Sequence, residues 1–100
     1  MRAEFVAPRN SVEEVLTPIW RQLLGVEQVG VHDNFFALGG DSLLATRLVA
    51  RLRVTFEIEV PIATVFIGPT VAEQSLVVTE LLLSQIEGMT EGEAEAMVAS

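Results

Sequence analysis

Apolar and polar positions follow a helical spacing most clearly between residues 42 and 56, in the segment "SLLATRLVARLRVTF". Leucines recur every four residues from Leu44 to Leu52, and Arg47 and Arg51 fall on the opposite side. One apolar face and one charged face are typical of a helix that packs on a core. The pattern therefore predicts an amphipathic helix over residues 42–56.

A second helix is predicted over residues 11–25, "SVEEVLTPIWRQLLG", where Ser11 and Glu14 have the spacing of a capping box. Pro18 conflicts with this prediction, because a proline inside a helix removes a hydrogen bond and kinks the axis. Thr17 could instead cap a later start, with Pro18 as the first helical residue. We prefer one kinked helix, because the apolar stripe begins before the proline. The stripe consists of Val12, Val15 or Leu16, Ile19 and Leu23.

Two further helices are predicted in the second half of the chain. "VPIATVFIGPT" (60–70) offers a short turn of helix between two prolines. Thr70 and Glu73 then form a second capping box, which opens a long helix. This helix is apolar on nearly every side over residues 76–83, so the sequence does not assign its buried face.

A third capping box, Thr90 with Glu93, heads a short acidic helix at the C-terminus. No internal repeat is present. The predicted fold is all-α, with three longer helices, one short helix and a C-terminal helical extension.

The connection over residues 26–41 is long for a compact domain and rich in Gly, Asn and Asp. Connections of this length are usually functional. Apolar side chains should anchor it, with at least one of the two phenylalanines buried. These anchors are Val29, Val31, Phe35, Phe36 and Leu38.

Composition narrows the class of protein. Half of the 100 residues are apolar and 20% are charged, as in a single folded domain. A net charge of −8 disfavours binding to nucleic acid or to an anionic membrane. The sequence has no cysteine, no signal-peptide pattern and no apolar run that could span a bilayer. We therefore expect a cytoplasmic domain that is monomeric in isolation.

Ser42 is the one candidate for chemistry at a helix start. The hydrolase motif G-x-S-x-G is not met, because Leu44 stands where the second glycine should be and His32 is the only histidine. A calcium loop starting at Asp33 fails as well, since Phe35 would occupy a ligand position. No catalytic residue and no metal site are predicted.

Ser42 could instead cap the helix or carry an attached group. Asp41 or Ser42 suffices as a cap, and capping does not require the preceding Gly39-Gly40 pair. Two glycines leave room for another protein near the serine hydroxyl, and a helix N-terminus favours a phosphate. The combination suits a serine that carries a phosphodiester.

The segment "DNFFALGGDSLLATRLVARLR" closely resembles the core motif of peptidyl carrier (thiolation) domains of nonribosomal peptide synthetases, in the phosphopantetheine-binding acyl carrier family. "FVAPRN" and "VPIATVFIGPTVAEQS" are similar to other parts of such domains. The resemblance implies an acyl-carrier-like four-helix bundle over residues 11–84. A lead-in of residues 1–10 would precede it, and an acidic helical extension of residues 85–100 would follow.

By this resemblance Ser42 would be the attachment point of 4′-phosphopantetheine, which a phosphopantetheinyl transferase would take from coenzyme A. Gly39 and Gly40 would open the loop, and Asp41 would precede the modified serine. The thiol of the arm would hold aminoacyl or peptidyl groups as thioesters. The domain itself would catalyse nothing.

The resemblance also implies a surface for partner domains. Leu43, just after the serine, would be an exposed contact, whereas Leu44 would be part of the core. The other implied contacts are Arg47, Arg51, Val65, Phe66 and Ile67, although Phe66 is expected in the core rather than at the surface, because aromatic side chains are often buried. The partners would be the transferase together with adenylation and condensation domains, and epimerisation or thioesterase domains are further candidates.

Two other functions stay open from the sequence. One is a discrete acyl carrier protein of polyketide or fatty-acid assembly, and the other is an unmodified helical docking module. Residues 85–100 pack back on the preceding helix, dock to a partner module or form a loosely ordered tail. Their apolar side would consist of Ile86, Met89, Met97 and Val98.

Overall fold

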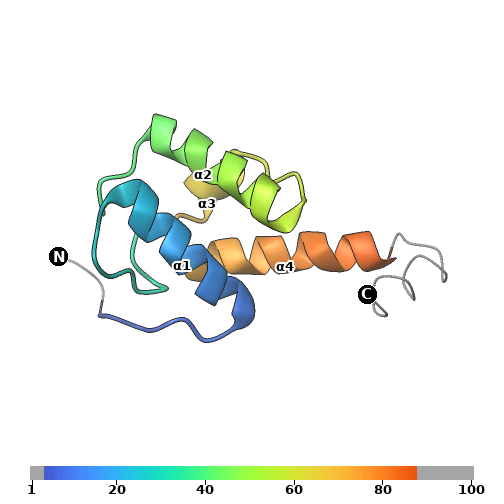
Figure 1. The fold of residues 1–100 in the computed structure, drawn as a ribbon, viewed down its shortest axis with the longest axis horizontal. Coiled ribbons are helices and arrows are strands. Elements are labelled where there is room, and N and C mark those ends of the chain that lie inside the picture. Colours follow the sequence, from blue (N-terminus) through green and yellow to red (C-terminus); the bar gives the residue numbers. More distant parts are fainter. Residues whose placement is uncertain (1–3, 88–100) are drawn as a thin grey trace.

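The computed structural model describes residues 4–87, which form a bundle of four helices (Figure 1). The helices are α1 (Ser11–Leu24), α2 (Ser42–Phe56), α3 (Ala63–Ile67) and α4 (Val71–Glu87). No strand occurs within residues 4–87. The predicted all-α fold of three longer helices and one short helix is confirmed. The further helix predicted at Thr90 lies outside the described residues.

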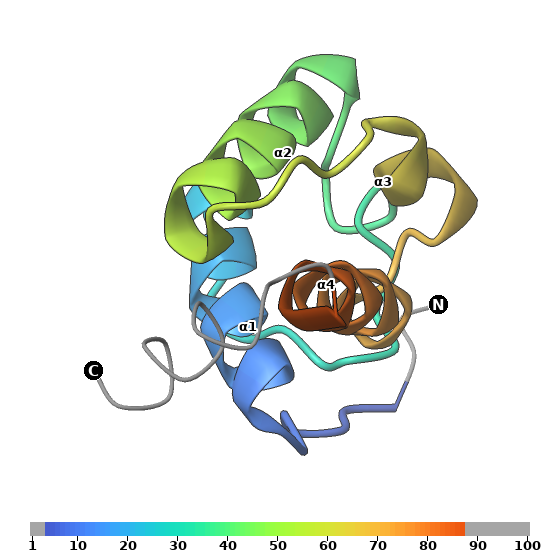
Figure 2. The same cartoon turned by 90° about the vertical axis from the view of Figure 1, so that its right-hand side faces the viewer.

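α4 holds the bundle together through its contacts with α1 and α3. α1 packs on both α2 and α4, and α3 packs on α4. Figure 2, which looks along α4, shows α1 and α3 against different sides of it. The buried apolar side chains come from all four helices and from the two longer connections. They are Leu16, Ile19, Trp20, Val29, Val31, Phe35, Ala45, Leu48, Leu52, Ile58, Val60, Val65, Val71 and Val78.

The N-cap of α1 is one residue earlier than predicted, at Asn10 and not at Ser11. Asn10 is the N-cap, in extended conformation, and its side-chain oxygen accepts a 2.9 Å hydrogen bond from the backbone N–H of Glu13. Ser11 is therefore the first helical residue, and the prediction that it caps the helix is wrong. The helix continues through Pro18 as one element, so the alternative of a later start is also wrong. It ends at Gly25, whose φ of 66° is left-handed, as predicted for a stop.

The start of α4 is capped as predicted. The backbone N–H of Glu73 donates to Oγ1 of Thr70 at 3.1 Å, and the Thr70 hydroxyl donates to Oε1 of Glu73 at 2.9 Å. The buried Gln74 then joins three elements: its Oε1 accepts from Nε1 of Trp20 at 3.1 Å, and its Nε2 donates to the carbonyl of Gly68 at 3.2 Å. These bonds fix the end of α3 and the core face of α1 relative to α4.

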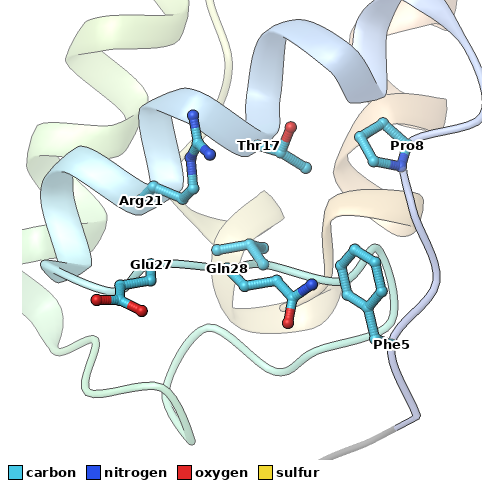
Figure 3. A pocket seen from close by; sticks show the side chains of 7 residues that line it. Phe5, Pro8, Thr17, Arg21, Glu27 and Gln28 are labelled. Carbon is cyan, nitrogen blue, oxygen red and sulfur yellow. The ribbon is translucent and has the colours of Figure 1, made fainter.

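The lead-in packs on the bundle before α1 begins. The backbone N–H of Val31 donates to the carbonyl of Val6 at 2.9 Å, which holds the lead-in against the connection after α1. A hollow of about 310 Å³ remains between the lead-in, α1 and this connection. Among the residues that line it, Phe5 and Pro8 lie on one side and Arg21 on another (Figure 3). The lead-in is thus part of the folded unit from Val6 onward.

A buried carboxylate fastens the lead-in to α1. Glu13 is 1% exposed, and its oxygens accept from Nε and Nη2 of Arg9 at 3.1 and 2.7 Å and from the Arg9 backbone N–H at 2.8 Å. The side-chain hydrogen bonds from Arg9 hold the pKa of Glu13 below its usual range, against the opposing effect of burial.

Candidate functional site

The connection between α1 and α2 folds around a buried phenylalanine. Phe35 is fully buried, and Val29 and Val31 are buried beside it, as predicted. The Asn34 side-chain oxygen accepts from the backbone N–H groups of Phe36 and Ala37 at 2.9 and 3.1 Å, which turns the chain after Phe35. This turn was not predicted from the sequence, although asparagine side chains often accept from the backbone two residues on and so form turns.

The two glycines of this loop serve different purposes. Gly39 has a φ of 108°, a conformation that residues with a side chain rarely adopt. At Gly40, an added Cβ would lie 2.4 Å from two ring carbons of Phe35 and 2.7 Å from its carbonyl oxygen. The backbone N–H of Gly40 also donates to that carbonyl at 3.0 Å. Gly40 is therefore needed for packing on Phe35, in addition to the predicted role of leaving the serine accessible.

Asp41 caps α2, and Ser42 is its first residue. Oδ1 of Asp41 accepts from the backbone N–H of Leu44 at 2.9 Å, and Asp41 has the extended conformation of an N-cap. Ser42 is exposed, and its hydroxyl makes no hydrogen bond with residues 4–87. Capping thus belongs to Asp41 alone, which leaves the Ser42 oxygen available for a bond to another group.

A chain of aromatic contacts leads from the core to the surface of α3. The ring of Trp20 meets that of Phe35 edge-on at 5.0 Å, and Phe35 meets Phe36 edge-on at 5.4 Å. The ring of Phe36 stacks on that of Phe66 at 5.2 Å, with an interplanar angle of 22°. The Phe36–Phe66 stack joins the loop before Ser42 to α3, a contact that was not predicted from the sequence.

Two of the predictions for α3 need correction. Val65 is fully buried, so it belongs to the core and cannot be a partner contact. Phe66 is 48% exposed, so the alternative that it lies in the core is wrong. Ile67 is 82% exposed, in agreement with the predicted contact role.

The predicted contacts on α2 lie on its outer surface. Leu43 is 60% exposed, whereas Leu44 is half-buried and packs against the core, as predicted for adjacent leucines. Arg47 and Arg51 are both exposed. Nη2 of Arg51 donates to Oε1 of Gln22 on α1 at 3.0 Å, so this side chain also links two helices.

The region around Ser42 fits a group attached through a phosphodiester. The serine lies at the N-terminus of a helix of 15 residues, where the unpaired backbone N–H groups and the helix dipole favour a negative charge. The first turn of α2 contains no acidic residue. The exposed apolar side chains of α2 and α3 include Leu43, directly after the serine on α2, and Phe66 and Ile67 on α3.

Residues 14–82 match the sequence pattern of the family described as "Phosphopantetheine attachment site". The chain belongs to this family. The prosthetic group of the family is 4′-phosphopantetheine. The fold and sequence of this chain are those of a peptidyl carrier domain of nonribosomal peptide synthetases.

Relatives of this carrier domain occur within very long synthases. It is 63% identical over 73 residues to one polypeptide of the linear gramicidin synthase of Brevibacillus parabrevis, and 51% identical over 81 residues to another polypeptide of the same synthase. These matches cover 73% and 81% of the chain. They span only 1% of the length of each synthase polypeptide.

Solved structures of carrier domains share the fold. A prototype peptidyl carrier domain of modular peptide synthetases has a TM-score of 0.68 and 39% identity, covering 75% of this chain and 99% of that one. A peptidyl carrier protein in complex with the phosphopantetheine transferase Sfp and coenzyme A has a TM-score of 0.74 and 37% identity, covering 76% and 99%. A docking domain complex of the Pax synthetase, PaxA T1-CDD/PaxB NDD, has a TM-score of 0.80 and 28% identity, covering 100% and 94%.

Proposed function

We propose that Ser42 carries the phosphopantetheine arm and that the arm carries aminoacyl or peptidyl groups during nonribosomal peptide synthesis. The observation that supports this most strongly is the exposed hydroxyl of Ser42 at the start of α2, inside the matched family segment. The arm supplies a thiol for thioester formation, which this chain lacks because it has no cysteine.

The protein's contribution is to present one oxygen atom. The Ser42 oxygen forms the new bond to phosphorus, the nucleotide part of coenzyme A leaves, and the hydroxyl proton passes to the transferase or to solvent. Asp41 and the Gly40–Phe35 contact keep the start of α2 in place while this happens. Because the serine oxygen is the only reacting atom that we place on the chain, we propose that the domain is a carrier without catalytic activity of its own.

The partner surface of this carrier consists of Leu43, Arg47, Arg51, Phe66 and Ile67. All five are exposed, and they lie on α2, which begins at Ser42, and on α3. Their partners would be a phosphopantetheinyl transferase and adenylation and condensation domains, with epimerisation or thioesterase domains as further candidates. The similarity to a carrier bound to a transferase supports the first of these.

We also propose that the carrier domain spans residues 11–84, with the lead-in packed against it, and that residues 85–100 serve in docking. The similarity to the docking domain complex PaxA T1-CDD/PaxB NDD, which covers the whole of this chain, supports this assignment. No helix within residues 4–87 is long and apolar enough to cross a membrane. We further propose a cytoplasmic location, to which the absence of cysteine is suited.

Intact mass tests the proposed attachment. Incubation with coenzyme A and a phosphopantetheinyl transferase of broad specificity should add the mass of one phosphopantetheine group to the wild-type chain and none to Ser42→Ala. A Thr46→Ala variant is a matched control that should still gain the mass. A folded wild-type protein that gains no mass would contradict the proposal.

Substitutions of the adjacent residues Leu43 and Leu44 should separate an effect on partner binding from an effect on stability. Leu43→Ala should change the free energy of unfolding by less than about 0.5 kcal/mol, because the side chain is 60% exposed, but should slow transfer of the arm. Leu44→Ala should cost about 1–2 kcal/mol, because part of its side chain packs on the core. Urea unfolding and initial transfer rates measure the two effects, and equal stability losses would contradict the assignment.

A further inference from the structure

The outward face of α4 carries leucines where a bundle helix normally has polar residues. Val71, Gln74 and Val78 are buried on the core side of this helix. At about 100° per residue, Leu76 and Leu83 fall on the opposite side, and they are 66% and 52% exposed. Apolar positions seven residues apart on an outer face are typical of a helix that packs on a second helix.

Glutamates alternate with these leucines. The same spacing places Glu73, Glu80 and Glu87 on this side, and all three are exposed. We define the α4 outer face as Glu73, Leu76, Glu80, Leu83 and Glu87. α4 contains no lysine or arginine, so these carboxylates have no cation on their own helix. Glu87 lies at the C-terminus of α4, where the helix dipole disfavours a negative charge.

An apolar hollow continues the α4 outer face toward α3. Its volume is about 390 Å³, and Glu73 and Val77 of α4 form one of its walls. The other wall consists of Pro61, Ala63, Thr64, Ile67 and Gly68. Gly68 brings the two walls together, since an added Cβ there would lie 2.9 Å from Cβ of Glu73. A long apolar side chain could therefore enter the hollow next to the carboxylate of Glu73.

The negative charge of the α4 outer face favours some binding partners over others. A second copy would place glutamates of one α4 outer face against those of the other, which is unfavourable. An anionic membrane would be repelled for the same reason. Residues 88–100 of this chain contain three more glutamates and no basic residue, so they are also a poor match. A basic partner would neutralise the carboxylates and cover the leucines.

We propose that the α4 outer face and the adjoining hollow form a docking surface for an amphipathic helix of another protein. That helix has leucine-like side chains at heptad spacing, lysine or arginine beside them, and one apolar side chain in the hollow. The surface includes neither Ser42 nor Leu43, and it shares only Ile67, in the wall of the hollow, with the partner surface. α4 also extends away from the N-terminal end of α2 (Figure 1). Docking here is therefore compatible with access to Ser42.

A designed peptide tests this surface directly. The probe is a labelled helical peptide of about three heptads, with leucine at the core positions and lysine at the flanking ones, and binding is followed by fluorescence anisotropy. The full chain should bind it, and Leu76→Ser/Leu83→Ser should weaken binding by at least about tenfold. Leu43→Ser is the matched control, because it removes an equally exposed leucine elsewhere and should leave binding unchanged.

A charge exchange separates a specific site from general attraction between a basic peptide and an acidic protein. Glu80→Lys should weaken binding of the lysine peptide and strengthen binding of a peptide with glutamate in place of lysine. Circular dichroism confirms that each variant is folded. No binding by the wild-type chain, or equal binding by wild type and Leu76→Ser/Leu83→Ser, would overturn the proposal. Attachment of the arm at Ser42 is measured separately and should be normal in Leu76→Ser/Leu83→Ser and in Glu80→Lys.

Discussion

Gly40→Ala should lower the free energy of unfolding by about 1–3 kcal/mol, the range for overpacking a filled core. The new Cβ would lie 2.4 Å from the Phe35 ring, and this ring is fully buried and in contact with Trp20 and Phe36. In a domain of this size each kcal/mol should lower the melting temperature by roughly 4–8 °C. Transfer of the arm should also slow, because displacement of the loop moves Asp41 and Ser42.

A double-mutant cycle identifies the cause. Phe35→Leu removes part of the ring that the new methyl group would meet, so Gly40→Ala should cost less stability in a Phe35→Leu background than alone. Gly25→Ala is the control: its left-handed φ of 66° gives it a cost of its own, but nothing lies within 4 Å of an added Cβ there, so this cost should be the same in both backgrounds. Additive losses at residues 35 and 40 would show that contact with the ring is not the reason for the glycine.

Arg9→Ala should make the domain markedly less stable at pH 7. The substitution removes the two side-chain hydrogen bonds that Arg9 donates to Glu13. The Glu13 carboxylate, which is 1% exposed, then keeps only the hydrogen bond from the backbone N–H of residue 9. Arg53→Ala is the matched control, because this arginine is exposed at the end of α2 and should have little effect. Thermal unfolding followed by circular dichroism measures both losses.

The loss in Arg9→Ala should depend on pH in a defined direction. The pKa of Glu13 is lower in the folded than in the unfolded chain, so its contribution to stability is complete above its usual value near 4.5. That contribution is lost as the pH falls through the folded pKa. The difference in melting temperature between wild type and Arg9→Ala should therefore shrink in acid. Glu13→Gln should be less pH-dependent than wild type, and a gap that stays constant down to pH 3 would argue against the ion pair.

The sequence predicted the long helices well, because α1 and α2 have a regular apolar period and α4 has a clear local start signal. α2 has the predicted bounds, and Thr70 and Glu73 cap α4 as expected. The cap of α1 was misplaced by one residue because two residues suited to capping, Asn10 and Ser11, stand side by side. Local signals of this kind identify an end without fixing its last residue.

The sequence did not predict the contacts that depend on the path of the chain. α3 has only five residues, too few for a periodic pattern to show which side faces inward. Val65 is buried there and Phe66 is outside, because α3 packs on α4 while Phe66 stacks on Phe36. The Gly40–Phe35 contact and the Arg9–Glu13 pair likewise depend on how the loop and the lead-in fold back on the bundle.

Fragment mass spectrometry of the modified chain tests the central claim, attachment at Ser42, most directly. Trypsin should release residues 22–47, in which Ser42 and Thr46 are the only hydroxyl-bearing residues. After incubation with coenzyme A and the transferase, the added mass should lie on this fragment, and its fragmentation should place the group on Ser42. A phosphopantetheine group on Thr46, or on any other tryptic fragment, would contradict the account.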